Sequence, residues 1–145
     1  MYKHILIPTD GTELSSRAVV HGCELAKAVG AAVSLLHITT PFRIFTTDPA
    51  QIEDTPGEHD RHARERATAV LGEAAEIAKR VGASYECLTE SHNDPYEVIL
   101  QLAYARRCDL VVMASHGRRG MSAFLLGSET NKVLAHSRIP VLVVR

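Results

Sequence analysis

The chain has 145 residues, and its 16 Lys and Arg side chains nearly balance its 17 Asp and Glu side chains, for a formal charge of −1 at pH 7. This balance excludes a general electrostatic attraction to nucleic acid or to an anionic membrane surface. The sequence contains no run of about 18 apolar residues, the length that crosses a bilayer. We therefore expect a single domain over residues 1–145, with neither a nucleic-acid partner nor a membrane partner.

The cysteines and the N-terminal residues both indicate a cytoplasmic protein. Cys23, Cys87 and Cys108 are odd in number and widely spaced, which favours free thiols in a reducing compartment. Residues 1–10 carry one Lys before a short apolar run that ends at Pro8, which is not the pattern of a secretory signal peptide.

The first half of the chain alternates between apolar runs and helical periodicity. Residues 4–7 predict a strand, and from Leu14 to Val29 apolar or small residues recur at spacings of 4, 4, 3 and 4, one face of a helix. Gly30 is a typical helix stop, and residues 33–38 predict a second strand.

Residues 40–57 are interrupted by three prolines and show no period, so we expect a long mobile loop. A long helix is predicted over residues 58–81. The alternating, more polar residues 85–89 are typical of an edge strand.

The second half of the chain continues the alternation. Asp94 and Pro95 predict the N-cap and first residue of a helix. Residues 110–114 form the most apolar run and predict a central strand. A helix is expected over residues 128–136, and a last strand over residues 139–144.

This alternation predicts an α/β, Rossmann-like fold with an open five-stranded, largely parallel sheet and helices on both faces. In such sheets ligands bind beyond the carboxyl ends of the strands, at the topological switch point. The segments after the first and fourth strands are therefore the places to look for a site.

The segment after the first strand reads Pro8-Thr9-Asp10-Gly11. A carboxylate at this place can accept hydrogen bonds from ribose hydroxyls or from the amino group of a base. The alternative is that Asp10 or Thr12 only caps the helix that follows.

The segment after the fourth strand contains glycines and opens a helix at Ser128. A helix N-terminus preceded by Gly127 is a suitable anion site, because free N–H groups point outward and glycine lets a phosphate approach. The hydroxyls of Ser128 and Thr130 can add hydrogen bonds, and Arg118 and Arg119 can neutralise a polyphosphate. The alternative is a glycine-rich connection with Ser128 as N-cap.

Together these residues resemble the universal stress protein family from end to end. The matching segments are Ile-Leu-Ile-Pro-Thr-Asp-Gly at 5–11, Ser-His-Gly at 115–117, Leu-Leu-Gly-Ser at 125–128 and Ile-Pro-Val-Leu-Val-Val at 139–144. The family's ATP-binding signature, Gly-x2-Gly-x9-Gly-Ser/Thr, reads here Ala114-x2-Gly117-x9-Gly127-Ser128. The spacing fits, and the first glycine is replaced by alanine.

The resemblance implies a sheet order of 3-2-1-4-5, an adenine nucleotide alpha hydrolase-like fold, and ATP lying across the first and fourth strands, where Mg²⁺ or Mn²⁺ can accompany it. The implied ligand contacts are Pro8, Thr9, Asp10 and Ile38 around the adenosine, Met113 and Ala114 beside the base and ribose, and Gly117, Gly127, Ser128, Glu129 and Thr130 around the phosphates. His116 either contacts the phosphates, as Arg118 and Arg119 can, or only shapes the turn. The methyl group of Ala114 would crowd the ribose only if that position needs a positive φ or a close approach.

The resemblance also implies a regulatory protein of the stress response that forms a homodimer. Its interface would be the last strand, with Val141, Leu142, Val143 and Val144, an apolar sheet edge that needs a partner. We find no convergent metal-ligand set and no general base, so we assign no metal and no catalytic residue. A nucleotide-free dimeric scaffold and a slow ATP hydrolase are the alternatives. His37, beside Ile38, is interpreted as a packed strand histidine.

Overall fold

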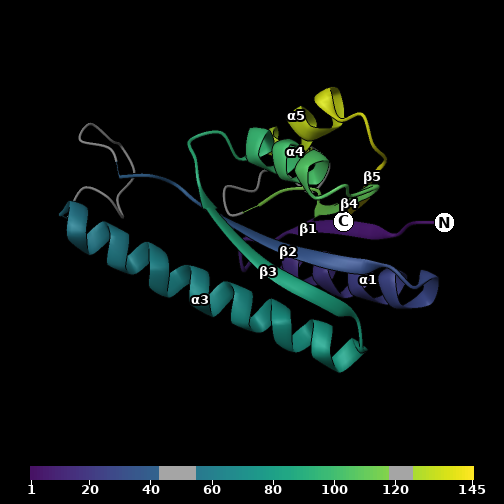
Figure 1. The fold of residues 1–145 in the computed structure, drawn as a ribbon. Helices are drawn as coiled ribbons and strands as arrows, with labels where there is room; N and C mark the ends of the chain where they lie inside the picture. Colours follow the sequence, from purple (N-terminus) through teal and green to yellow (C-terminus); the bar gives the residue numbers. More distant parts are fainter. Residues whose placement is uncertain (43–54, 118–125) are drawn as a thin grey trace.

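One parallel sheet with the strand order β3-β2-β1-β4-β5 organises the molecule (Figure 1). The computed structural model describes residues 1–42, 55–117 and 126–145. Its elements in chain order are β1 (His4–Pro8), α1 (Glu13–Val29), β2 (Ala32–Thr39), α3 (Pro56–Val81), β3 (Ser84–Ser91), α4 (Pro95–Ala105), β4 (Leu110–Ala114), α5 (Ser128–His136) and β5 (Val141–Val144). The predicted α/β fold and strand order are confirmed.

The helices cover both faces of the sheet, with α1 and α3 on one side and α4 and α5 on the other (Figure 1). Ile5 and Ile7 of β1 pack on the α1 and α3 side, whereas Leu6 packs on the α4 side. Successive side chains of a strand point to opposite faces, so a strand that is covered on both faces must be apolar throughout. This is why β1 and β4, whose buried residues are apolar on both faces, can occupy the centre of the sheet.

Several element boundaries differ from the expected ones for identifiable reasons. Helix α3 begins at Pro56, two residues early, because Thr55 and Glu58 form a capping box and Pro56 suits the first turn. Strand β5 begins at Val141 and not at residue 139, since Pro140 has no N–H to donate to the ladder. Most of the expected loop at 40–57 lies outside the described residues.

Asp94 occupies the predicted N-cap position of α4, but its side chain makes no capping hydrogen bond. The carboxylate of Glu129, from α5, instead accepts a hydrogen bond of 2.8 Å from the backbone N–H of Tyr96 in the first turn of α4. A residue far along the chain therefore caps this helix. In the described part of the chain, no helix is both long and apolar enough to cross a membrane.

Polar side chains cover the end of the sheet at which the strands have their amino ends. The Ser34 hydroxyl donates to Glu86 Oε1 at 2.7 Å and lies 2.8 Å from His4 Nε2, while Arg106 Nη1 contacts both Glu86 oxygens at 2.9–3.0 Å. Because these groups satisfy one another, this edge is held together by its own side chains. The two candidate segments lie at the opposite end of the sheet, where the strands have their carboxyl ends.

Gly22 of α1 supplies a test of the core, because a Cβ at this position would overlap Ile7 Cδ1 and lie 3.0 Å from Ile7 Cγ1. Gly72, in the exposed middle of α3, has nothing within 4 Å of the same position. We expect Gly22→Ala to lower the free energy of unfolding by about 1–3 kcal/mol through overpacking. Gly72→Ala, the control, should raise it by about 0.5–1 kcal/mol because alanine is the better helix former. Urea unfolding measures both, and equal effects would contradict the packing described.

Asp109 supplies a test of how β1 is anchored. Burial opposes ionisation of its carboxyl, but hydrogen bonds from the backbone N–H groups of His4 and Lys3 outweigh this and lower the pKa below its ordinary value of 3.8. A lowered folded-state pKa gives stability that is present above the ordinary pKa and lost as the pH falls through the folded value.

Asp109→Asn should therefore reduce the free energy of unfolding at neutral pH, and the difference from the wild type should shrink as the pH falls below 3.8. Denaturant unfolding at a series of pH values measures this. A difference that stays constant down to the acid limit would show that the charge of Asp109 is not involved.

Candidate functional site

The central strands β1 and β4 separate at their carboxyl ends. Strand β1 pairs with β2 as far as Pro8, and β4 pairs with β5 as far as Ala114. Between β1 and β4, however, the paired residues end at Leu6 and Val111. The two strands lead to opposite halves of the sheet, which is the switch point where α/β proteins bind ligands.

The turn after β1 is built around Asp10. Its Oδ1 accepts hydrogen bonds from the backbone N–H of Thr12 at 3.1 Å and from the Thr12 hydroxyl at 2.7 Å. Thr12 is the N-cap of α1 and its hydroxyl accepts from the N–H of Ser15. The expected capping by Thr12 is confirmed, and Asp10 orients the capping residue. Gly11 takes a φ of 81°, which favours glycine.

Gly117, after β4, brings the two candidate segments together. A Cβ on this glycine would lie 2.5 Å from Oδ2 of Asp10, so a residue with a side chain would require that carboxylate to move. The carboxylate expected to face a ligand therefore lies directly against the loop expected to hold phosphates.

Gly127 docks α5 onto the same loop. Its N–H donates to the carbonyl of Ser115 at 2.7 Å, and a Cβ on Gly127 would lie 3.0 Å from both Cα and Cβ of His116. Gly127 is also the N-cap of α5, because its backbone is extended and its carbonyl accepts from the N–H of Asn131 at 3.0 Å. The alternative that Ser128 is the N-cap is wrong, since Ser128 is already the first helical residue.

The first turn of α5 offers a ligand mainly backbone N–H groups. No side chain caps this turn within the described residues. The Thr130 hydroxyl, expected to face phosphate, is buried and donates to the carbonyl of Ala114 at 2.9 Å. The Glu129 carboxylate accepts from Tyr96 and lies 3.3 Å from Lys132 Nζ. The side chain of Ser128 is exposed and makes no hydrogen bond to the other described residues.

Known proteins share this arrangement of strands. The model of the universal stress protein family matches residues 1–145. The chain belongs to the universal stress protein family.

Relatives and solved structures agree with this membership. A universal stress protein of Thermus aquaticus is 32% identical over 145 residues, covering all of both chains. The structure of MJ0577, a universal stress protein of Methanocaldococcus jannaschii, superposes with a TM-score of 0.80 at 29% identity, covering 99% of this chain and 96% of the other. A universal stress protein in complex with cAMP superposes with a TM-score of 0.75 at 26% identity, covering 99% and 97%.

The departure from the universal stress protein signature at Ala114 causes no backbone strain. Within the described ranges Arg107 is the only non-glycine residue with a positive φ, so Ala114 keeps an ordinary strand conformation. Ala114 is buried in the core cluster on the α1 and α3 side, together with Val112. A positive φ, one of the two conditions under which its methyl would crowd a ribose, is therefore absent.

The remaining expected residues surround the end of the sheet. Met113 is buried on the α4 and α5 side, whereas Pro8, Ile38 and His116 are half-buried. His116 Nδ1 lies 3.2 Å from the Ser115 hydroxyl. Residues 118 and 119, the two expected arginines, lie outside the described residues.

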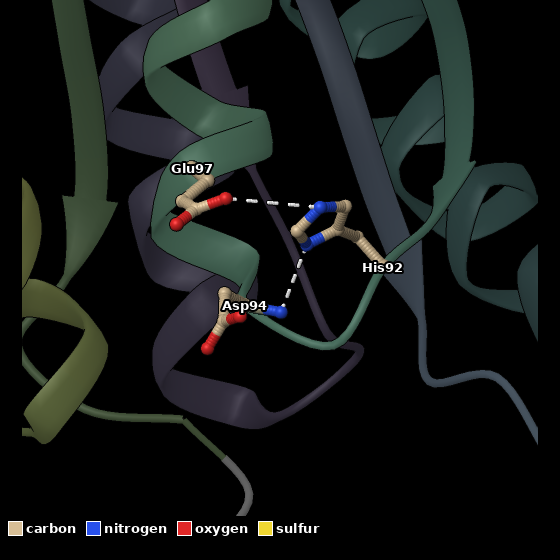
Figure 2. A group of neighbouring side chains, drawn as sticks. All are labelled: His92, Asp94 and Glu97. Carbon is tan, nitrogen blue, oxygen red and sulfur yellow. Dashed lines mark hydrogen bonds and ion pairs between the residues drawn. The ribbon is translucent and has the colours of Figure 1, made fainter.

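A cluster of His92, Asp94 and Glu97 lies between β3 and α4 and could hold a divalent cation, since one ligand atom from each lies within 4.8 Å of the others (Figure 2). No ligand motif in the sequence marks this cluster, because the turn into α4 is what brings the three side chains together. His92 Nδ1 already accepts from the N–H of Asp94 at 2.9 Å, and Nε2 lies 3.8 Å from Glu97 Oε2. The helix N-terminus favours anions over cations, so these contacts serve the turn into α4.

An open hollow also lies between α1 and α3, lined by residues such as Val20, Lys27 and Ile77. The residues that line this hollow include no glycine and no residue from the first turn of a helix, whereas both are found at the switch point. We therefore place the candidate site at the carboxyl ends of β1 and β4.

Proposed function

We propose that this universal stress protein binds ATP beyond the separated carboxyl ends of β1 and β4, and that the bound state regulates a stress response. The observation that carries the proposal is the first turn of α5, whose N–H groups have no side-chain cap in the described residues and follow Gly127, which lies against His116. The adenosine would lie toward Thr9, Asp10 and Ile38, and the phosphates toward Ser128.

The phosphate end of the proposal rests on helix electrostatics. The N-terminus of an α-helix carries a partial positive charge and presents unpaired N–H groups, which together bind phosphate without a dedicated cation. In the proposal Arg118 and Arg119 add charge, and Ser128 adds a hydroxyl donor. This fits a protein with a net charge of −1, which attracts no polyanion through its overall field.

The adenine end of the proposal is supported by a relative. The neighbour at 26% identity was solved in complex with cAMP, which is an adenine nucleotide. In this chain the carboxylate of Asp10 lies beyond the carboxyl end of β1 and would accept hydrogen bonds from ribose hydroxyls. We propose ATP as the ligand because the uncapped turn of α5 suits a chain of phosphates.

Mg²⁺ or Mn²⁺, where it accompanies the nucleotide, would be held chiefly by the phosphates. Near α5 the Glu129 carboxylate already contacts Tyr96 and Lys132, and Asp10 Oδ1 already binds Thr12. These acids therefore do not fit a dedicated metal cage. The metal would add positive charge that lowers the repulsion between phosphates.

Binding affinity for ATP tests the proposal, with Gly127→Ala as the variant. The added Cβ would displace the backbone of His116 and tilt the N–H groups of α5, so we expect affinity to fall by more than about tenfold. Isothermal titration calorimetry measures it, and Gly72→Ala, on the exposed face of α3, is the control that should bind like the wild type.

Equal affinity of Gly127→Ala and the wild type would refute the binding geometry. A wild-type protein that binds no adenine nucleotide would favour the nucleotide-free scaffold. Sustained phosphate release that disappears in His116→Ala would favour the slow hydrolase.

We further propose that β5 pairs with β5 of a second copy to form a homodimer. Strand β5 is the edge of the sheet, and Leu142 is 40% exposed on it. An apolar edge strand exposes unpaired backbone groups, and a two-fold pairing covers them on both copies at once.

Leu142→Lys should shift the protein toward the monomer, because the charge would be repeated across the two-fold axis. Leu134→Lys is the matched control, since Leu134 is 41% exposed, like Leu142, but belongs to α5 and not to β5. Sedimentation equilibrium measures the change. A wild type that stays monomeric at high concentration, or equal effects of the two variants, would refute the interface.

A further inference from the structure

His37, near the end of β2, has a buried imidazole ring, and one of its nitrogens has no hydrogen-bond partner in the part of the chain that the structure describes. The residue is 4% exposed, and its Nδ1 lies 3.0 Å from the carbonyl oxygen of Thr9. A carbonyl oxygen can only accept, so Nδ1 carries the proton, and in the neutral ring Nε2 is then a bare acceptor. Among the described residues Nε2 has no hydrogen-bond partner.

An apolar side chain would satisfy packing at this position better than histidine does. Val33 and Leu35 precede His37 on the same face of β2, and both are fully packed in the α1 and α3 core. A leucine at 37 would continue this pattern and leave no unpaired nitrogen. Since a buried polar group without a partner is unfavourable, the contact made by Nδ1 is the feature that distinguishes histidine here.

That contact holds the first residue beyond the paired part of β1. The paired residues of β1 and β2 end at Pro8, and the next residue, Thr9, donates its N–H to Leu36 O at 2.8 Å. The Thr9 hydroxyl lies 3.0 Å from that of Ser15. Because His37 Nδ1 contacts the Thr9 carbonyl, each of the three polar groups of Thr9, its N–H, its hydroxyl and its carbonyl, has a hydrogen-bond partner.

The residue after Thr9 is Asp10, whose carboxylate lies against Gly117 and would face the ribose. The orientation of the Thr9 carbonyl fixes the peptide plane that leads into Asp10, because the peptide unit is planar. A side chain of β2 therefore controls the direction in which the turn after β1 leaves the sheet.

We propose that His37 is a positioning residue of the nucleotide site, acting through its Nδ1–H on the Thr9 carbonyl to hold Asp10 in its binding orientation. The proposal rests on the proposed nucleotide binding, and it assigns a role to a histidine that the sequence pattern presents only as a packed strand residue. His37 itself does not touch the ligand.

Three substitutions separate positioning from packing. His37→Asn keeps a donor close to the place of Nδ1, since the asparagine amide nitrogen is attached at the same carbon. His37→Gln places its amide near Nε2 instead, and His37→Leu removes both polar atoms. Val33→Ala is the control, because it weakens the same core at the other end of the same strand face without contacting Thr9.

We expect His37→Asn to bind ATP within about twofold of the wild type, and His37→Leu and His37→Gln to bind about five- to tenfold more weakly, the loss that accompanies one hydrogen bond. Val33→Ala should lower the melting temperature and leave affinity unchanged. His37→Asn binding as weakly as His37→Leu, or Val33→Ala losing as much affinity, would overturn the proposal.

A measurement without ligand separates this proposal from the proposed function. In the unliganded protein, amide exchange at Asp10, whose N–H shares a peptide unit with the Thr9 carbonyl and lies 3.4 Å from Ser15 Oγ, should be faster in His37→Leu than in the wild type and restored in His37→Asn. The Ala32 amide, which donates to Lys3 O at the opposite edge, is the internal control. If the wild type binds no nucleotide, the proposed function fails, and exchange alone decides the role of His37. Unchanged exchange at the Asp10 amide in His37→Leu would refute that role.

Discussion

The early end of pairing between β1 and β4 is the constraint on which the rest of the site depends. Each strand continues its hydrogen bonds with its outer neighbour, β2 or β5, after the ladder between the two has ended at Leu6 and Val111. The connections after β1 and β4 must then fold back toward opposite faces of the sheet. A parallel sheet with crossovers of one hand leaves such a separation at the point where the strand order reverses.

The glycines at this point have a specific steric task. Gly117 leaves room for the Asp10 carboxylate, and Gly127 lets the first turn of α5 lie against the backbone of His116. These two approaches join the turn after β1, the loop after β4 and the N-terminus of α5. The result concentrates partial positive charge and donors at one place, which a near-neutral chain cannot supply through its net charge.

Much of this arrangement could be predicted from local patterns. Apolar runs identify β1 and β4, glycines at 30 and 82 end α1 and α3 in left-handed conformations, and the spacing of Gly117, Gly127 and Ser128 locates the loop. Each of these signals depends on residues close together in the chain. The strand order itself came from the resemblance to a family, because local periodicity does not specify which strands are neighbours.

The contacts that the sequence did not reveal are those between distant residues. Glu129 caps α4 through Tyr96, the Thr130 hydroxyl binds the Ala114 carbonyl, and His37 binds the Thr9 carbonyl. Each involves a backbone group, which has no sequence signature, and each depends on how helices and strands pack. The side chains of Glu129 and Thr130 consequently support the scaffold of the site, and the N–H groups of the same turn are what it can offer a ligand.

The most direct test of the central claim is a titration of ¹⁵N-labelled protein with ATP, followed by amide chemical shifts. The account predicts saturable shifts at Gly117 and in the first turn of α5 from Ser128 to Thr130, with no change at Ala32 or Asp109 on the opposite edge. Shifts confined to the hollow between α1 and α3, or no shift at any amide, would contradict it.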